Sequence, residues 1–316
     1  RNIVNKPTFS WLAVLVRDIL RKLVNAKATT QKKMTTQKIR LLVASMGRER
    51  LSYNLVSRRW VTEDLILAPV LDSLDEDKLF QVQFLYKFPY PGRLKVPASL
   101  LGHNFGISIW EKYLGGSISG QIRRKKHDFN LLMSELWSNR DFQSLWVYKG
   151  IDIWEIMRQP FSHIWHWELN LAIRYLELSE EIMETYKPQA VLIASETSLD
   201  NKALVIAANQ RGIPVTALQQ GTIVAADDWL ADYSVDPKDL DGPQSKSWFY
   251  PSVTCLFGEE TRRLVTDEMG YPYPDALSVT GQPRFDSLVR ITDPEDYQDL
   301  RRSLGIPTNK KIVLIG

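Results

Sequence analysis

The chain is poor in the residues that support covalent cross-links and metal sites. It has one cysteine, Cys255, and four histidines in 316 residues. A single cysteine excludes an internal disulfide framework and fits a reducing compartment, so we expect a cytoplasmic protein. Cys255 lies in the apolar run VTCLF. Because free cysteine is among the most buried residue types, we expect a buried thiol there.

Long apolar runs and glycine-rich nucleotide motifs are also missing. No apolar run approaches the roughly 20 residues that span a bilayer, and no secretory signal pattern is visible. Neither the P-loop pattern GxxxxGK[ST] nor a full GxGxxG occurs. The sequence therefore predicts neither a membrane-spanning helix nor a P-loop nucleotide site.

Acidic residues are scarce in the first part of the chain. Residues 1–60 hold 14 Lys+Arg and 2 Asp+Glu, a net charge of +12, which leaves −9 for the rest of the chain, whose total is +3. Residues 9–24 have the spacing of a basic amphipathic helix, which can lie on an anionic membrane surface or pack against its own protein. Residues 25–38 read as a polar linker. No aromatic–basic interleaving indicates nucleic-acid binding, and we expect none.

Alternating apolar runs and helical periods indicate an α/β fold. Short apolar runs at residues 39–45, 190–194, 213–218, 252–257 and 277–280 are separated by helical patterns. Residues 46–60 read as helix or loop. This alternation predicts a Rossmann-like parallel sheet with helices on both faces.

The most informative stretch runs from residue 187 to residue 223. An apolar strand is followed by Ser195-Glu196-Thr197, by a helix over 199–210 that Gly212 ends, and by a second strand. That strand leads into Gln219-Gln220-Gly221-Thr222. Strands of a βαβ unit are parallel, so both polar groups are expected at one edge of the sheet, where open α/β sheets bind ligands.

Three further patterns carry weaker signals. Gly47 and Arg48 follow the first strand and could cradle an anion, although a plain turn is the alternative. His163 and His166 have the i, i+3 spacing of metal ligands, but no third ligand occurs at a matching distance. We therefore expect no metal.

Tryptophans gather in the long helical stretch of residues 154–186. Trp154, Trp165 and Trp167 are expected to be core anchors, because large aromatic side chains mainly bury area.

Several segments in order resemble the GT-B glycosyltransferases. These segments are PQAVLIASE, ALVIAANQRGIP, LQQG, VTCLFGEE and SVTGQPRFDSL, and the resemblance covers about residues 148–316. The chain is most similar to glycosyltransferases of surface polysaccharide synthesis, a neighbourhood that includes UDP-N-acetylglucosamine 2-epimerases and CDP-glycerol glycerophosphotransferases. Their fold has two Rossmann-like domains that face each other across a cleft, the first for the acceptor and the second for the nucleotide-sugar donor.

The resemblance implies a division of the chain. Residues 1–38 would be a basic helix and linker, and residues 39–290 would be the N-terminal, acceptor-side domain. Residues 291–316 would be an interdomain helix and the first strand of a truncated donor-binding domain. We expect the chain to be a fragment that is inactive alone.

The same resemblance implies transfer of a sugar from a nucleotide sugar to a glycan or lipid-linked acceptor. Peripheral contact with the inner face of the plasma membrane would go through residues 9–24. A UDP-N-acetylglucosamine 2-epimerase-like enzyme and a non-catalytic GT-B-like binding module are the alternatives. Relatives often carry Gln-His-Gly where this chain has Gln219-Gln220-Gly221, and glutamine cannot carry a proton near neutral pH.

Each candidate residue then has an expected role. Glu196 would be the general base, with helix capping as its alternative. Ser195 and Thr197 would contact substrate beside it. Hydrogen bonds that orient substrate would come from the second polar group, namely Gln219, Gln220, Gly221 and Thr222.

Gly281 and Arg284, in TGQPRFD, would lie on the donor side, with Arg284 contacting a phosphate or forming a structural ion pair. Asp227 and Asp228 are adjacent and lack the Asp-x-Asp spacing of metal-dependent transferases. No metal and no cofactor are expected, since the nucleotide sugar is a substrate.

Overall fold

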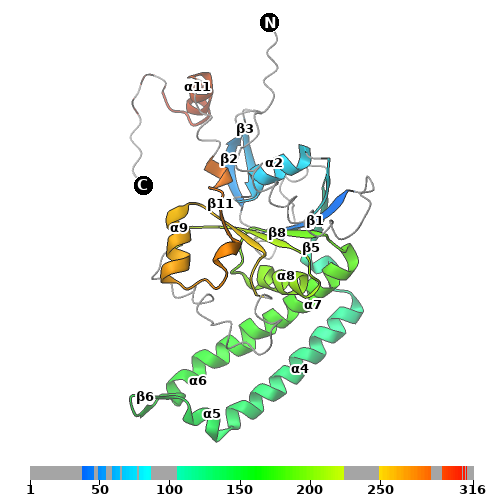
Figure 1. The fold of residues 1–316 in the computed structure, drawn as a ribbon, viewed down its shortest axis with the longest axis vertical. Coiled ribbons are helices and arrows are strands. Elements are labelled where there is room, and N and C mark those ends of the chain that lie inside the picture. Colours follow the sequence, from blue (N-terminus) through cyan, green and yellow to red (C-terminus); the bar gives the residue numbers. More distant parts are fainter. Residues whose placement is uncertain are drawn as a thin grey trace.

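A seven-stranded parallel sheet forms the centre of the protein (Figure 1). The computed structural model describes residues 38–45, 49–54, 59–64, 66–76, 78–86, 105–223, 249–285, 294–307, 309 and 311. The strand order is β11-β10-β9-β8-β1-β4-β5, and every pairing in this sheet is parallel. The predicted α/β class is confirmed. The strands are β1 (Ile39–Ala44), β4 (Phe80–Tyr86), β5 (Gly106–Ile109), β8 (Ala190–Ile193), β9 (Val215–Leu218), β10 (Val253–Leu256) and β11 (Leu277–Val279).

The order of the strands reverses beside β1. From β1 the chain builds outward through β4 and β5, then returns to pair β8 with the other side of β1, with Leu41 opposite Ala190. It then continues outward to β11. Ligands of open α/β sheets bind outside the carboxyl ends of the strands near such a reversal. The fold therefore directs attention to the segments that follow β1, β8 and β9.

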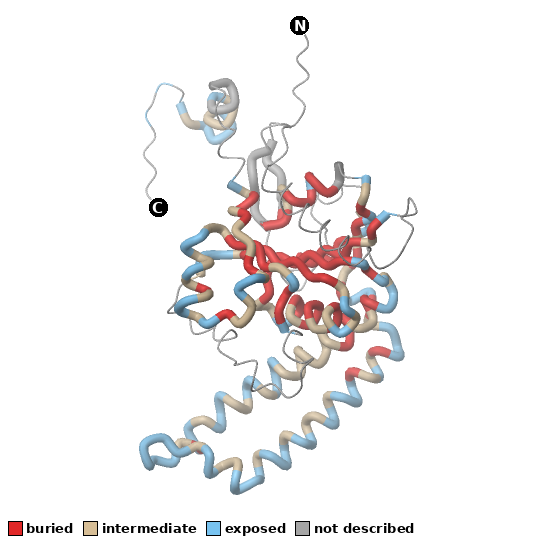
Figure 2. Tube along the Cα trace, viewed as in Figure 1, coloured by how far each residue is buried: buried red, intermediate tan, exposed pale blue. Residues whose placement is uncertain are grey.

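Helices cover both faces of the sheet, as predicted. Side chains alternate along β1, so Leu41 and Val43 pack on the face of α2 (Ala68–Glu76). Leu42 and Ala44 pack on the opposite face, with α8 (Leu199–Gln210), the end of α7 (Asn170–Tyr186) and the start of α4 (Gly116–Ser138). Burial on both faces explains why these strands are continuous apolar runs (Figure 2).

The segments around the central strands lie where the sequence predicts them. The helix α8 has the predicted bounds, and Gly212 beyond its end adopts a φ of 63°. After β10, α9 (Glu259–Arg263) and the turn η6 (Leu264–Glu268) pack on the sheet edge through a small cluster of their own that includes Leu256 and Val265. Cys255 is buried on the α2 face, as predicted. The short turns η1 (Trp110–Tyr113), η7 (Pro274–Ala276) and η8 (Pro283–Phe285) and the helix α11 (Pro294–Ser303) complete the described elements.

Residues 49–64 correct a prediction. They form an antiparallel pair of strands, β2 (Glu49–Asn54) and β3 (Arg59–Asp64), where helix or loop was expected. Asp64 ties this hairpin to the sheet, because its carboxylate accepts hydrogen bonds from Ser45 Oγ (2.5 Å) and from the N–H groups of Ile66 and Leu67. The two strands are stabilised by pairing with each other and by this buried carboxylate. The sequence of these residues has no apolar periodicity that would predict either contact.

A long helical arm, residues 116–176, projects from the sheet (Figures 1 and 2). The chain runs outward from the sheet along α4. At the far end it turns through α5 (Arg140–Ser144) and the two-stranded hairpin of β6 (Val147–Tyr148) and β7 (Ile151–Asp152). The return runs through α6 (Trp154–His163) and the π-helical turn η2 (Ile164–Leu169) into α7.

The tryptophan predictions on this arm have mixed outcomes. Trp154 is buried and Trp165 packs against Trp137 and Phe161. Trp167 is 67% exposed, so its predicted role as a core anchor is wrong. The reason is that a two-helix arm has only one inward face, and Trp167 lies outside it.

Some predicted features lie outside the described residues. These are the basic segment 9–24 and its linker, Gly47, Arg48, Asp227, Asp228 and the last strand after residue 311. The division at residues 290 and 291 stays a prediction.

Candidate functional site

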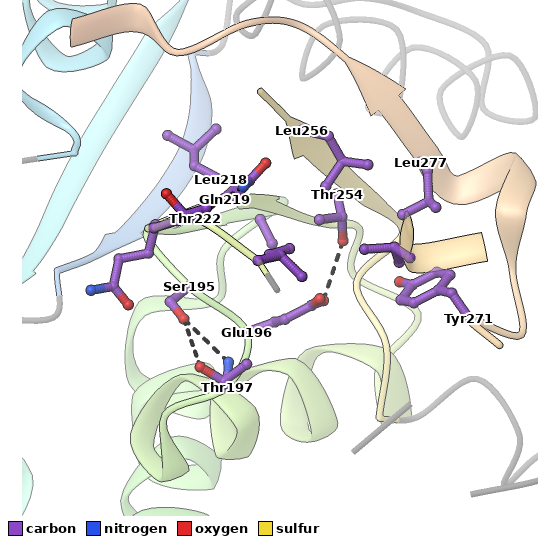
Figure 3. A pocket seen from close by; sticks show the side chains of 15 residues that line it. Ser195, Glu196, Thr197, Leu218, Gln219, Thr222, Thr254, Leu256, Tyr271 and Leu277 are labelled. Carbon is purple, nitrogen blue, oxygen red and sulfur yellow. Dashed lines mark hydrogen bonds between the residues drawn. The ribbon is translucent and has the colours of Figure 1, made fainter. Parts of the chain in front are cut away.

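A pocket opens at the carboxyl ends of β8, β9 and β10 (Figure 3). Its volume is about 240 Å³. The walls are partly apolar, from Ala217, Leu218, Ile223, Leu256, Val265 and Leu277. The remaining lining residues are Ser195, Glu196, Thr197, Gln219, Gln220, Gly221, Thr222, Thr254 and Tyr271. The two polar groups predicted to share one edge of the sheet thus line one pocket, while their roles remain predictions.

Glu196 is held inside this pocket. Its side chain is buried and points across the pocket toward Thr254 and Tyr271 (Figure 3). Oε2 of Glu196 accepts a hydrogen bond of 3.2 Å from Thr254 Oγ1, which β10 projects from the same face as Leu256. The carboxylate therefore reaches sideways to a neighbouring strand. It has the position of a fixed acceptor facing the cavity.

Tyr271 supplies a protonated phenol next to this carboxylate. Burial raises the pKa of Tyr271 well above its usual value, and the negative charge of Glu196 raises it further, against a lowering effect of Thr254. Because both main effects favour the neutral form, the phenol keeps its proton at physiological pH. A buried carboxylate and a neutral phenol in one cavity form a pair of acceptor and donor.

Ser195 and Thr197 stabilise the loop after β8 through each other. Their hydroxyl oxygens lie 3.1 Å apart, and the Thr197 N–H donates to Ser195 Oγ at 3.3 Å. Asn201 Nδ2 donates to the Ser195 carbonyl at 2.8 Å, which anchors the loop to the first turn of α8. The loop that presents Glu196 is therefore braced from both sides.

Gln219 is engaged within the protein. Its Nε2 donates to the Gly221 carbonyl and its Oε1 accepts from the Phe257 N–H, both at 2.7 Å. The side chain thus clamps the loop after β9 to the end of β10. The predicted contact with substrate falls more naturally to Gln220, which is half-buried, and to the exposed Gly221 and Thr222.

Gly281 and Arg284 lie apart from this lining. The Gly281 N–H donates to the Leu256 carbonyl, and Gly281 has a φ of 77°, a conformation that favours glycine. The guanidinium of Arg284 lies 4.8 Å from the ring centroid of Phe285. Neither residue belongs to the pocket, so their donor-side roles stay predictions.

Thr254 and Tyr271 belong to the site and were missed from the sequence. Thr254 is the polar member of an apolar strand, and period-two alternation with Leu256 could have placed it on the pocket face. Tyr271 follows a helix end and carries no sequence signal of a site.

Among the described residues that line the pocket, Glu196 is the only charged one. Hydroxyl and amide groups of a ligand would find acceptors and donors here. A phosphate would face the Glu196 carboxylate, whose negative charge disfavours its binding in this pocket.

Within the described part of the chain, no three His, Cys, Asp or Glu side chains are grouped as metal ligands. His163 and His166 both lie exposed on the arm. No helix in the described residues is long and apolar enough to cross a bilayer.

The fold is an α/β fold with a pocket at the carboxyl edge of a parallel sheet. No protein-family model matches the chain, and no curated protein matches it. The solved structures that are similar include two UDP-GlcNAc 2-epimerases. The Neisseria meningitidis enzyme, bound to UDP-GlcNAc, is 13% identical with a TM-score of 0.42, and the match covers 87% of this chain and 56% of that one. The Rickettsia bellii enzyme is 12% identical with a TM-score of 0.36, and the match covers 86% and 52%. The chain spans about half the length of these enzymes.

Proposed function

We propose that the chain is the acceptor-side part of an enzyme that acts on a nucleotide sugar, and that the reaction is transfer of the sugar to a glycan or lipid-linked acceptor. The observation that carries the proposal is the buried Glu196 carboxylate in a pocket otherwise lined by hydroxyl, amide and apolar groups. Sugars offer many hydroxyl donors together with apolar C–H faces, and such a pocket suits both. The ordered motifs of the sequence, from PQAVLIASE to SVTGQPRFDSL, support the same class.

In this proposal Glu196 is the general base. The acceptor hydroxyl passes its proton to the carboxylate as its oxygen bonds to the anomeric carbon, and the bond from that carbon to the departing phosphate breaks. The bond from Thr254 holds the carboxylate in place, and Tyr271 can donate a hydrogen bond to the sugar. Gln220 and Thr222 orient the substrate at the rim.

The nucleotide diphosphate would bind outside the pocket. A phosphate inside it would meet the negative charge of Glu196, and the described lining residues include no cation. Gly281 and Arg284 remain the proposed donor-side contacts, and Gly47 with Arg48 the proposed substrate contacts to a phosphate. This division leaves the pocket to the sugar hydroxyls and the acceptor.

Glu196→Gln in the complete protein tests the role of the base. Glutamine keeps the size and the acceptor oxygen for Thr254 but cannot take up a proton, so we expect turnover to fall by about 10²–10⁴-fold with folding retained. Glu181→Gln, a charge removal on α7, is the matched control and should leave turnover unchanged. Near-normal turnover in Glu196→Gln would exclude Glu196 as the base.

The second candidate is a UDP-N-acetylglucosamine 2-epimerase, the activity named for both similar structures. Incubation of the complete protein with a panel of nucleotide sugars, with and without acceptors, separates the two reactions by NMR. Nucleotide release that requires an acceptor supports transfer. Epimerised sugar without any acceptor supports the epimerase, and absence of donor binding and of both products would leave a non-catalytic module.

We also propose that residues 9–24 make a peripheral membrane contact that brings the enzyme to lipid-linked acceptors. The support is their basic amphipathic pattern. Deletion of residues 1–38 should abolish flotation with anionic vesicles. Unchanged flotation would contradict this contact.

A further inference from the structure

The helical arm exposes most of the large apolar side chains that lie on the described surface. Ten of the fourteen exposed large apolar residues in the described part of the chain belong to it. Three of the most exposed are at its far end, namely Leu145 at 76%, Ile156 at 70% and Ile151 at 65%. Monomeric proteins seldom leave so much apolar surface uncovered in one region.

This exposure is built into a rigid tip. Beneath it the rings of Trp137, Phe142, Trp146, Trp154, Phe161 and Trp165 pack with centroids 4.5 to 6.2 Å apart. The Asp152 carboxylate accepts from the Trp154 N–H at 2.8 Å, and the Ile153 N–H donates to the Trp146 carbonyl at 2.9 Å. Since the interior of the tip is already filled by aromatic rings, the aliphatic side chains outside cannot turn inward.

The area involved matches a protein interface. Ten side chains that are each about half exposed present on the order of 1,000 Å², whereas a standard interface uses about 800 Å² per partner. The β6–β7 hairpin alone is too small to provide an interface of that area. The exposed apolar residues extend further, from Leu131 in α4 to Trp167 in η2. The extent of the patch therefore suits a partner that lies along the arm.

The distribution of charge indicates which partner. Residues 123–128 of α4, in the sequence RRKKHD, hold four cations and one anion, and Lys125 pairs with Glu177 beside them. Residues 135–158 toward the tip hold four acidic and three basic residues, and Arg158 pairs with Glu155. The tip therefore has a small net charge of the opposite sign to the base of the same arm, which gives no net attraction to an anionic lipid surface.

We propose that the arm is a dimerisation element. The arms of two copies lie antiparallel, so that the acidic tip of each contacts the basic base of the other. This arrangement is self-complementary, as a two-fold interface requires, and it turns two helical hairpins into a four-helix bundle that covers their exposed leucines and isoleucines.

The oligomeric state of the full chain tests the proposal. By sedimentation velocity the protein should be a dimer at micromolar concentration. The double variant Leu145→Ser/Ile156→Ser should raise the dissociation constant by at least about 100-fold, because it removes two apolar anchors. Leu304→Ser is the matched control, because Leu304 is an exposed leucine outside the arm, and this variant should remain dimeric. A wild-type chain that stays monomeric at 100 µM, or a tip variant that dimerises as well as Leu304→Ser, would overturn the proposal.

Flotation with vesicles of phosphatidylcholine and phosphatidylglycerol tests whether the tip of the arm binds a lipid bilayer instead of a second copy of the chain. Binding that is lost in the tip variant of a monomeric protein would assign the tip to the bilayer and overturn dimerisation. Cross-linking reports the orientation, since Cys255 is buried and does not interfere. A mixture of Lys149→Cys and His127→Cys copies should cross-link tip to base, whereas efficient cross-linking between two Lys149→Cys copies would contradict the antiparallel arrangement.

Reversing the charges at the base and at the tip of the arm tests the electrostatic contribution to the proposed dimer. Arg123→Glu/Arg124→Glu should weaken the dimer, and the further changes Glu135→Lys/Asp141→Lys should restore it, because both ends of the arm then change sign together. Failure of the second pair to restore dimerisation would refute the pairing of tip with base.

Discussion

Thr254 offers the smallest change that tests how the pocket is held. Thr254→Val replaces one hydroxyl by a methyl group at a buried position, and both residues are β-branched, so the strand β10 should keep its geometry. What is lost is the 3.2 Å hydrogen bond to Oε2 of Glu196, together with the interaction of the same hydroxyl with Tyr271. Hydrogen bonds to charged groups contribute about 1.5–3 kcal/mol, so we expect the free energy of unfolding to fall by about that amount.

Thr216 provides the matched control on the adjacent strand. It is fully buried on β9, and its hydroxyl has no hydrogen-bond partner among the described residues. Thr216→Val removes the same hydroxyl without removing a bond, so its effect should be neutral or stabilising by about 1 kcal/mol. The difference between the two variants therefore measures the hydrogen bonds of the Thr254 hydroxyl, to Glu196 and Tyr271, free of the general cost of exchanging threonine for valine.

Urea denaturation followed by far-UV circular dichroism measures both variants, and equal slopes would show that the unfolded ensembles are comparable. The double variant Glu196→Gln/Thr254→Val completes a cycle, and the loss on Thr254→Val should shrink to about 1 kcal/mol when the carboxylate is absent. If Thr254→Val is no more destabilising than Thr216→Val, the hydroxyl does not hold Glu196, and the account of the pocket fails.

Three further predictions follow from buried groups. Burial raises the pKa of Cys255 to about 12, so its thiol should resist a disulfide reagent at pH 8 until urea unfolds the chain; rapid labelling of the native protein would contradict its burial. Burial likewise raises the pKa of Tyr186 to about 12. The folded state then keeps a proton that the unfolded chain releases near pH 10, and stability should be lost between about pH 10 and 12. Tyr186→Phe should flatten that alkaline decline in unfolding measured against pH, and an unchanged slope would refute the shift. Gln219→Leu should lower the free energy of unfolding by about 1–3 kcal/mol, since it leaves the Phe257 N–H without its acceptor and the Gly221 carbonyl without its donor. Unchanged thermal melts would argue against the clamp.

The central part of the fold could be predicted because its local signals agree. Apolar β-branched runs, one helical period and Gly212 gave β8, α8 and β9, and parallel pairing then placed the segments after both strands at one edge. Glu196 and Gln220 lie close together because β8 and β9 are parallel neighbours, and the strand–helix–strand pattern of the sequence already predicts that pairing.

The rest of the site depends on contacts distant in sequence. Thr254 reaches Glu196 across 58 residues, and Tyr271 comes from a loop after a helix. The engagement of Gln219 could not be foreseen, because its partner Phe257 becomes a neighbour only when β10 pairs with β9. The exposure of Trp167 has the same origin, since helical periodicity cannot tell a helix of the core from one that leaves it.

The strand order has a consequence for the time course of folding. β1 is made first among the sheet strands, yet its pairing with β8 joins Leu41 to Ala190, with the whole arm between them. At a synthesis rate of roughly 5–20 residues per second, about 10–30 seconds separate the two strands. During that interval the β8 side of β1 is an open edge of the strand, with unpaired backbone groups and the apolar side chains of residues 41–44. β1, an interior strand of the finished sheet, is thus the part of the nascent chain that waits longest for its partner, and the newly made protein is most exposed to aggregation in that interval.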